Sequence, residues 1–214
     1  MHATRILAIR HGETAWNVDT RIQGQLDIGL NDTGRAQAQW LARSLAEREP
    51  LQAIYASDLA RAWHTAQAVG QAQGLSVVAH TGLRERAFGD FEGRTFVEIE
   101  AELPEHARHW RQRTPDWAPP GAGESLLALR ERVLATVEAL ASRHVGEQIV
   151  LVAHGGVMDV LYRAATRLDL QAPRTWSLPN TAVNRLLWTP EGLSLVGWAD
   201  TSHLDDRSRD ETTA

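Results

Sequence analysis

Two histidines in this sequence lie at the ends of short apolar runs, and each is followed by glycine. The run at residues 6–9 is separated from His11 by one arginine, and His154 directly follows residues 149–153. In an open α/β sheet the carboxyl ends of the parallel strands lie at one edge, and ligands bind there. We therefore expect the two imidazole rings to meet at that edge, where they can do chemistry on a bound substrate.

Arginines accompany these histidines. Arg10 directly precedes the first histidine, and Arg61 lies in the first turn of a helix expected to follow a strand at residues 53–56. The planar guanidinium group of arginine binds phosphate oxygens in pairs. A helix expected after Gly155 adds free backbone N–H groups and a dipole that favours an anion. These groups together predict a phosphate-binding site.

A histidine is the best candidate for a nucleophile in this chain. The sequence has no cysteine and no Gly-x-Ser-x-Gly segment. Free imidazole has a pKa of about 6.5, so His11 is largely neutral near pH 7 and can attack phosphorus. The leaving alkoxide needs a proton, for which we select Glu85, in the irregular segment after a strand expected at residues 76–79. A surface salt bridge with Arg84 or Arg86 is the alternative interpretation of this carboxylate.

The composition limits the classes of partner. The chain has 214 residues, a net charge of −5 and no cysteine. A mildly acidic protein lacks the basic surface that nucleic acids and anionic membranes attract. No apolar run approaches the roughly 20 residues of a membrane span, and disulfides and cysteine-ligated metals are excluded. We expect a cytoplasmic protein that acts on a small molecule, without a nucleic-acid or membrane partner, and leave a homodimer open.

Apolar periodicity predicts the elements that position these groups. Strands are expected at residues 5–9, 53–56, 76–79 and 148–153, with a terminal hairpin at 183–189 and 193–198. Helices are expected at residues 31–49, 59–73, 96–114, 124–144 and 157–165. Strands that alternate with helices favour a parallel sheet with right-handed crossovers. We predict an α/β fold in one domain over residues 1–198 and a loose polar tail at 199–214, which contains His203.

Five segments of the chain, taken in order, resemble the signature of one family. They are Arg10-His11-Gly12-Glu13-Thr14 with Asn17, and the segments at residues 21–24, 57–66, 83–93 and 152–156. Through these segments nearly the whole chain resembles the histidine phosphatase superfamily, the phosphoglycerate-mutase-like proteins. The resemblance implies a three-layer α/β/α fold with a mostly parallel sheet and a site without a metal ion.

The resemblance also implies a role for each residue of the site. It makes His11 the residue that is phosphorylated and Glu85 the acid. The residues that would hold the phosphoryl group or lie over it are, in chain order, Arg10, Asn17, Gln23, Gly24, Arg61 and His154. We also expect Gly155 to be among the phosphate-binding residues. The substrate would be a small phosphorylated metabolite.

Two branches of this family differ in outcome. The resemblance to cofactor-dependent mutases implies adjacent arginines for a substrate carboxylate and a 2,3-bisphosphoglycerate primer, but here the arginines are spaced, at Arg108, Arg111 and Arg113. The turn at residues 121–125 is similar to one in the shorter phosphatases. We therefore expect a phosphomonoesterase without a cofactor. A phosphoglycerate mutase is the alternative, and a non-enzymatic phosphate-binding module is the third hypothesis.

Overall fold

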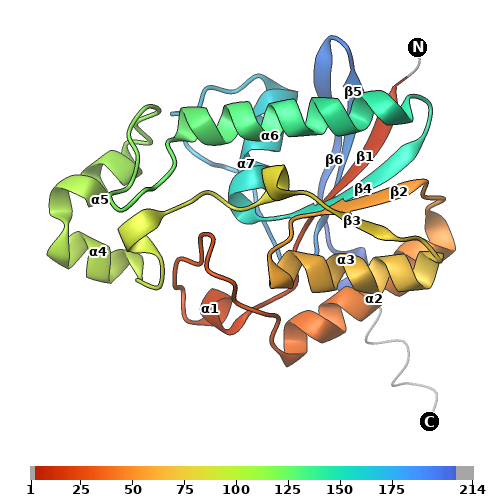
Figure 1. Ribbon diagram of the computed structural model, residues 1–214, viewed down its shortest axis with the longest axis horizontal. Helices are drawn as coiled ribbons and strands as arrows, with labels where there is room; N and C mark the ends of the chain where they lie inside the picture. The colour runs from red at the N-terminus through yellow and green to blue at the C-terminus, as the bar shows by residue number, and fades with distance from the viewer. Residues whose placement is uncertain (1–2, 206–214) are drawn as a thin grey trace.

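The computed structural model describes residues 3–205, in which a six-stranded sheet lies between two layers of helices (Figure 1). The strands are β1 (Thr4–Arg10), β2 (Ala53–Ala56), β3 (Val77–Ala79), β4 (Gln148–Ala153), β5 (Val183–Thr189) and β6 (Gly192–Asp200). Their order in the sheet is β3-β2-β4-β1-β5-β6. The first four strands in this order are parallel, and β5 and β6 run antiparallel. The first strand of the chain therefore occupies an interior position of the sheet.

Helices cover both faces of the sheet. In the described residues they are α1 (Ala15–Val18), α2 (Asp32–Arg48), α3 (Ala60–Gln73), α4 (Phe96–Glu102), α5 (Pro104–Arg111), α6 (Leu126–Ala141), α7 (Gly155–Thr166) and α8 (Ser202–Asp205). The pair α2 and α3 lies on one side of the sheet and the pair α6 and α7 on the other, while α4 and α5 stand to one side (Figure 1). The prediction of a three-layer α/β/α fold is confirmed.

The central strands are apolar on both faces because both faces are covered. Ile6 and Ala8 of β1 belong to the core beneath α6 and α7, whereas Leu7 and Ile9 belong to the core beneath α2 and α3. All six residues of β4 are buried. Such continuous apolar runs are typical of parallel strands inside an α/β protein.

The helix expected over residues 96–114 is instead two helices. Pro104 lacks a backbone N–H and is the first residue of α5, so α4 ends before it. Phe91, Ile99 and Ala107 form a small core of their own there, with Trp110 stacked on Phe91 at 5.4 Å. This cluster gives the two short helices a separate apolar base.

The polar tail predicted from residue 199 is wrong for its first part. β6 continues to Asp200, and α8 follows with His203 only 4% exposed. The polar composition of this segment suggested that it is exposed to solvent. A polar side chain can nevertheless be buried when it has a hydrogen-bond partner. The rest of the predicted tail, residues 206–214, lies outside the described residues.

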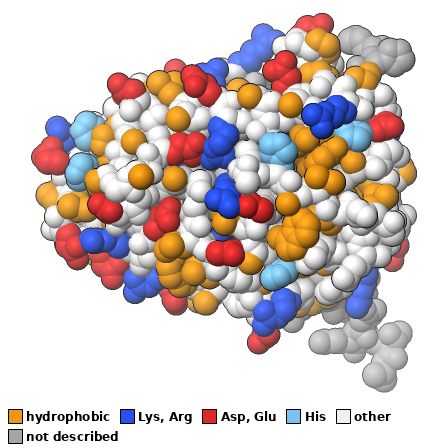
Figure 2. Space-filling model, in the orientation of Figure 1, with side chains coloured by type: hydrophobic (Ala, Val, Ile, Leu, Met, Phe, Trp, Pro, Cys, Tyr) orange, Lys and Arg blue, Asp and Glu red, His pale blue; other side chains and the backbone are white. Residues whose placement is uncertain are grey.

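The molecular face in Figure 2 mixes acidic and basic side chains, which lie beside one another over much of it. Hydrophobic side chains gather in the area of α3 and β3, where Val78 is 50% exposed. None of the helices in residues 3–205 is long and apolar enough to cross a membrane.

Candidate active site

The register between β1 and β4 brings the two histidines together. The strands are parallel and Arg10 lies opposite Ala153, so the next residue of each strand emerges at the same edge. The ring centroids of His11 and His154 are 5.2 Å apart and the rings are tilted by 57°. Both side chains are buried, at 3% and 0% exposed. The two imidazoles therefore lie side by side at the carboxyl edge of the sheet.

The surroundings of His11 fix which of its nitrogens is free. Its Nδ1 lies 2.7 Å from the carbonyl oxygen of Gly12 and must donate to it. The Gly12 N–H in turn donates to Thr65 Oγ1 at 3.0 Å, and that hydroxyl donates to the Arg61 carbonyl at 2.7 Å. With Nδ1 protonated, Nε2 carries the lone pair. Nε2 is thus the ring nitrogen of His11 that is able to act as a nucleophile.

Burial keeps both imidazoles neutral. The pKa of His11 lies well below its ordinary value, first because burial disfavours the charged ring and then because of the Arg61 and Arg10 charges. The hydrogen bond to Gly12 opposes this shift. Burial and the Arg61 charge likewise hold the pKa of His154 well below its ordinary value. Both histidines are therefore unprotonated at neutral pH, and neutral imidazole is the form that can attack phosphorus.

These lowered pKa values predict a pH-dependent stability. The unfolded chain gains protons on His11 and His154 below about pH 6.5, whereas the folded protein does not, so the free energy of unfolding falls as the pH drops. The limiting slope is about 1.4 kcal/mol per pH unit for each histidine. Urea unfolding followed by tryptophan fluorescence, in phosphate-free buffer between pH 7.5 and 5, measures it. A shallower slope is expected for His11→Gln, and equal slopes in both proteins would contradict the assignment.

Two buried guanidinium groups each keep one N–H without a protein partner. Arg61, fully buried at the start of α3, donates to the carbonyl oxygens of Leu26 at 2.9 Å and Gly24 at 2.7 Å. Arg10 donates to the carbonyl oxygen of Leu178. The Nε atoms of both arginines have no hydrogen-bond partner among the described residues. The two ring nitrogens of His154 also lack a partner there. Such buried donors normally find a partner, so their convergence indicates an anion site.

The two arginines remain cationic in this environment. Burial is the main cause that lowers the pKa of Arg61 to about 10, and the Glu85 charge opposes it. Burial also lowers the pKa of Arg10, again opposed first by Glu85. A group with a pKa near 10 is charged at neutral pH, so Arg61 can balance the negative charge of a phosphoryl group. The guanidinium group of Arg10 can contribute in the same way, because arginine side chains stay protonated in proteins.

Arg61 binds the loop that we expected to lie over the site. Gly24, through its carbonyl, is one of the acceptors of this arginine, and Gln23 beside it is 9% exposed with an unpartnered Oε1. Gly24 has φ +52, and a Cβ there would lie 2.0 Å from Glu92 Oε1. The left-handed backbone conformation therefore favours glycine at this position, and a larger residue would displace the Glu92 side chain.

Asn17 uses its side-chain oxygen inside the protein. Its Oδ1 accepts hydrogen bonds from the backbone N–H of Thr14 at 3.0 Å and from the Thr14 hydroxyl at 3.1 Å, within the capping box of α1. The amide nitrogen is the group of Asn17 that can donate to a ligand.

A second asparagine, Asn180, donates to the His11 carbonyl at 2.8 Å. No pattern in the sequence pointed to this residue.

The side chain of Glu85 contacts the first turn of α7. The Gly156 N–H is 3.0 Å from both of its carboxylate oxygens, and the Arg86 N–H donates to Oε1 at 2.8 Å. A Cβ on Gly156 would lie only 2.3 Å from Oε1, so glycine permits this approach. A Cβ on Gly155 would lie 3.8 Å from both Glu85 Oε2 and Arg10 Nε. Gly155 thus marks the place where the carboxylate and the guanidinium group border the same space.

An arginine of α6, Arg132, supports the segment that carries Glu85. Arg132 of α6 donates to the carbonyl oxygens of Gly82 at 2.9 Å and Arg84 at 3.0 Å, and pairs with Glu124 at 2.7 Å. Helical periodicity alone could not reveal this role, because Arg132 reads as an ordinary polar position of a helix. A salt bridge between Glu85 and Arg84 was the alternative interpretation of this carboxylate. In the structure Arg84 pairs with Asp58 instead, at 2.6 Å.

Three further arginines do not join this cluster of contacts. Their partners are Glu105 for Arg108, Glu100 for Arg111, and Asp159 for Arg113. Over residues 3–205 there is also no group of three or more histidine, aspartate and glutamate side chains that could hold a metal ion.

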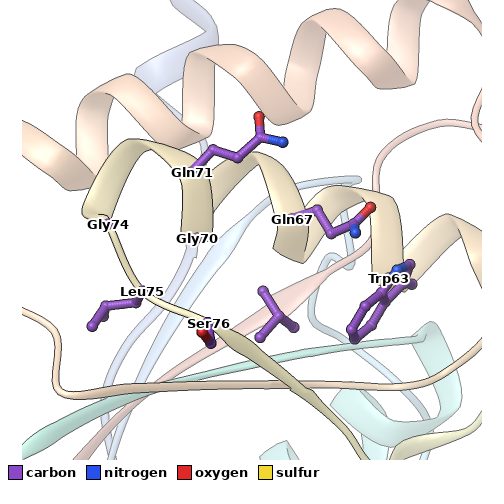
Figure 3. A pocket seen from close by; sticks show the side chains of 8 residues that line it. Trp63, Gln67, Gly70, Gln71, Gly74, Leu75 and Ser76 are labelled. Atoms are coloured by element: carbon purple, nitrogen blue, oxygen red, sulfur yellow. The ribbon is translucent and has the colours of Figure 1, made fainter.

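A separate pocket runs along α3 and does not include the histidines. It has a volume of about 420 Å³. Trp63, Gln67 and Gln71 line it from the helix, and Leu75 and Ser76 line it from the segment that leads into β3 (Figure 3). That segment precedes a strand, whereas the histidines follow the ends of strands. It contains no titratable side chain.

Comparisons with known proteins agree with this geometry. The family model of the histidine phosphatase superfamily (branch 1) matches residues 6–201. Two proteins of Arabidopsis thaliana are similar: phosphoglycerate mutase-like protein 4, 38% identical over 94% of this chain and 87% of that protein, and metal-independent phosphoserine phosphatase, 35% identical over 94% and 83%. The structure of mycobacterial glucosyl-3-phosphoglycerate phosphatase superposes with a TM-score of 0.82, at 36% identity over 92% of this chain and 99% of that chain. The chain belongs to the histidine phosphatase superfamily.

Proposed function

We propose that the protein hydrolyses a small phosphorylated metabolite through a phosphohistidine formed at Nε2 of His11. The observation that carries this proposal is the pair of buried, neutral imidazoles 5.2 Å apart, beside the unpartnered Nε–H groups of Arg10 and Arg61. A site that only held phosphate would need donors but no free nucleophilic nitrogen. The named phosphatases among the relatives support the same reaction class.

In the first half-reaction Nε2 of His11 attacks the phosphorus atom. A P–N bond forms, the ester P–O bond breaks, and the leaving alkoxide takes a proton from Glu85 to depart as an alcohol. Arg10, Arg61 and His154 would stabilise the phosphoryl oxygens, with the amide of Asn17 as a further donor. Their charges and dipoles are held in place before the substrate arrives, so little reorganisation is needed.

In the second half-reaction water replaces the alcohol. The Glu85 carboxylate accepts a proton from water as the oxygen attacks phosphorus, the P–N bond breaks, and inorganic phosphate leaves with His11 neutral again. The same carboxyl group therefore acts first as an acid and then as a base. The cycle as proposed has no step that uses a metal ion or another cofactor.

Hydrolysis is favoured over phosphoryl return to the substrate. A mutase needs cationic groups that grip the carboxylate of phosphoglycerate while the phosphoryl group changes position. The three arginines considered for this task, Arg108, Arg111 and Arg113, are each paired with a carboxylate of the protein. In this structure all three side chains thus make ion pairs within the protein.

Two assays test the proposed function. We expect the purified protein to hydrolyse p-nitrophenyl phosphate in the presence of a chelator. In a parallel assay, conversion of 3-phosphoglycerate to its 2-isomer with 2,3-bisphosphoglycerate as primer, and without release of phosphate, would favour the mutase. Phosphate binding without turnover in either assay would favour the binding module.

A further inference from the structure

The C-terminal helix α8 places a buried histidine that the proposed reaction does not use. His203 is 4% exposed, and its Nε2 lies 3.1 Å from the hydroxyl oxygen of Thr181. A hydroxyl group can donate or accept, so this hydrogen bond forms with either neutral tautomer of the ring. Burial lowers the pKa of His203, although the Asp200 and Asp205 charges oppose this shift. The imidazole is therefore a neutral, fixed partner of Thr181.

Thr181 adopts a conformation that a β-branched residue seldom takes. It is fully buried and has φ +56, in the left-handed region. Such a conformation persists only where the surroundings determine it, and it often occurs at functional sites. The hydroxyl of this side chain is the group that His203 holds. Contact with α8 is thus one of the interactions that fix this backbone.

The backbone of Thr181 supports the residues at the end of β1. Its N–H donates to the Arg10 carbonyl at 2.9 Å and lies 3.4 Å from the His11 carbonyl. The neighbouring Asn180 side chain donates to the same His11 carbonyl at 2.8 Å. The backbone carbonyls of Arg10 and His11 are therefore both hydrogen-bonded by residues 180–181.

We propose that His203 is a positioning residue, which fixes Thr181 and through it orients the Arg10–His11 backbone toward the phosphoryl group. This inference rests on the proposed function. Rotation of the Thr181 peptide would withdraw its N–H from the Arg10 carbonyl and free the strand end to move. Small displacements of a reacting group lower the rate strongly, because the reaction needs a near-attack geometry.

A purely structural role for His203 would have a different signature. If the histidine only anchored α8, its loss would lower thermal stability and leave the remaining folded protein with normal phosphate affinity and turnover. If it positions the site, folded protein binds and turns over less well. The hydroxyl of Thr181 must then matter to the same extent, because the effect passes through it.

Four variants and one double variant separate these roles. We expect His203→Ala and Thr181→Val each to lower kcat/KM for p-nitrophenyl phosphate about fivefold to tenfold, the effect of one lost hydrogen bond. The double variant should be no worse than either, because both remove the same contact. His203→Gln and Thr181→Ser, which keep a hydrogen-bonding group, should recover most of the activity. The inhibition constant for vanadate should rise in step with the loss of activity, and exposed His64→Ala serves as the control.

The thermal unfolding transition of each variant gives the fraction of folded protein at the assay temperature, and kcat/KM is corrected for that fraction. Additive effects in the double variant, or unchanged kcat/KM and vanadate inhibition in folded His203→Ala, would overturn the inference. If His203→Ala does not fold, the comparison of Thr181→Val with Thr181→Ser decides. The wild-type protein is also tested for an acid-labile phosphoenzyme. Should none form, the proposed function fails, and the affinity of the same variants for inorganic phosphate, measured by calorimetry, still tests the positioning role.

Discussion

Alanine in place of His11 is expected to lower kcat for any phosphomonoester by at least about 10⁴-fold and to abolish the phosphoenzyme. The proposed reaction has one nucleophilic atom, Nε2 of His11, whose Nδ1 is engaged by the Gly12 carbonyl, and the other imidazole with free ring nitrogens beside it is that of His154. His154 cannot replace it without a shift of the bound phosphoryl group, because its ring lies 5.2 Å away. Rapid acid-free quenching with labelled substrate and steady-state turnover in chelator measure both quantities.

His64→Ala is the matched control for this experiment. His64 is an exposed histidine on α3, three residues after Arg61, so its replacement tests for nonspecific effects of removing an imidazole. It should retain wild-type turnover. Preserved turnover in His11→Ala, or a labelled adduct that survives on that variant, would show that phosphorus is attacked by another group.

Glutamine in place of Glu85 is expected to lower kcat/KM for alkyl phosphates about 10²- to 10⁴-fold, the usual contribution of a general acid. The amide keeps the shape of the side chain and can still accept from the Gly156 N–H, but it has no proton to transfer. An aryl phosphate with a good leaving group needs this proton far less. The loss of activity on p-nitrophenyl phosphate should therefore be much smaller, and the ratio of the two effects is the measurement.

Glu131→Gln provides the control on the neighbouring helix α6, since Glu131 is exposed there. It should leave both substrates unaffected. An equal loss of activity toward alkyl and aryl phosphates in Glu85→Gln would mean that the carboxylate acts through charge or packing. Proton transfer to the leaving group would then have to be assigned elsewhere.

The local parts of this fold could be read from the chain because they depend on local patterns. The apolar runs that become β1 and β4 are buried on both faces, and their covered position follows from the absence of alternation. The order of the strands is another matter. Pairing of β1 with both β4 and β5 joins residues far apart in the sequence, and no local pattern encodes it.

The candidate site was predictable to a similar extent. The residue types at the strand ends indicated the phosphate chemistry, and the structure brings Arg10, His11, Arg61, Glu85 and His154 to one edge. The sequence could not show that Arg61 spends two of its donors on the loop at Gly24 and Leu26. Nor could it reveal His203, because a buried polar residue and a solvated one look alike until their partner is known.

The interior place of β1 has a consequence for how the protein is made. Its neighbours in the sheet are residues 148–153 and 183–189, so this strand leaves the ribosome long before either neighbour exists. Until then its backbone hydrogen-bonding groups have no partners in the sheet, a state that invites aggregation and chaperone capture. Long-range pairings of this kind also slow folding. The nascent polypeptide therefore carries His11 long before it can bring the imidazole of His154 beside it.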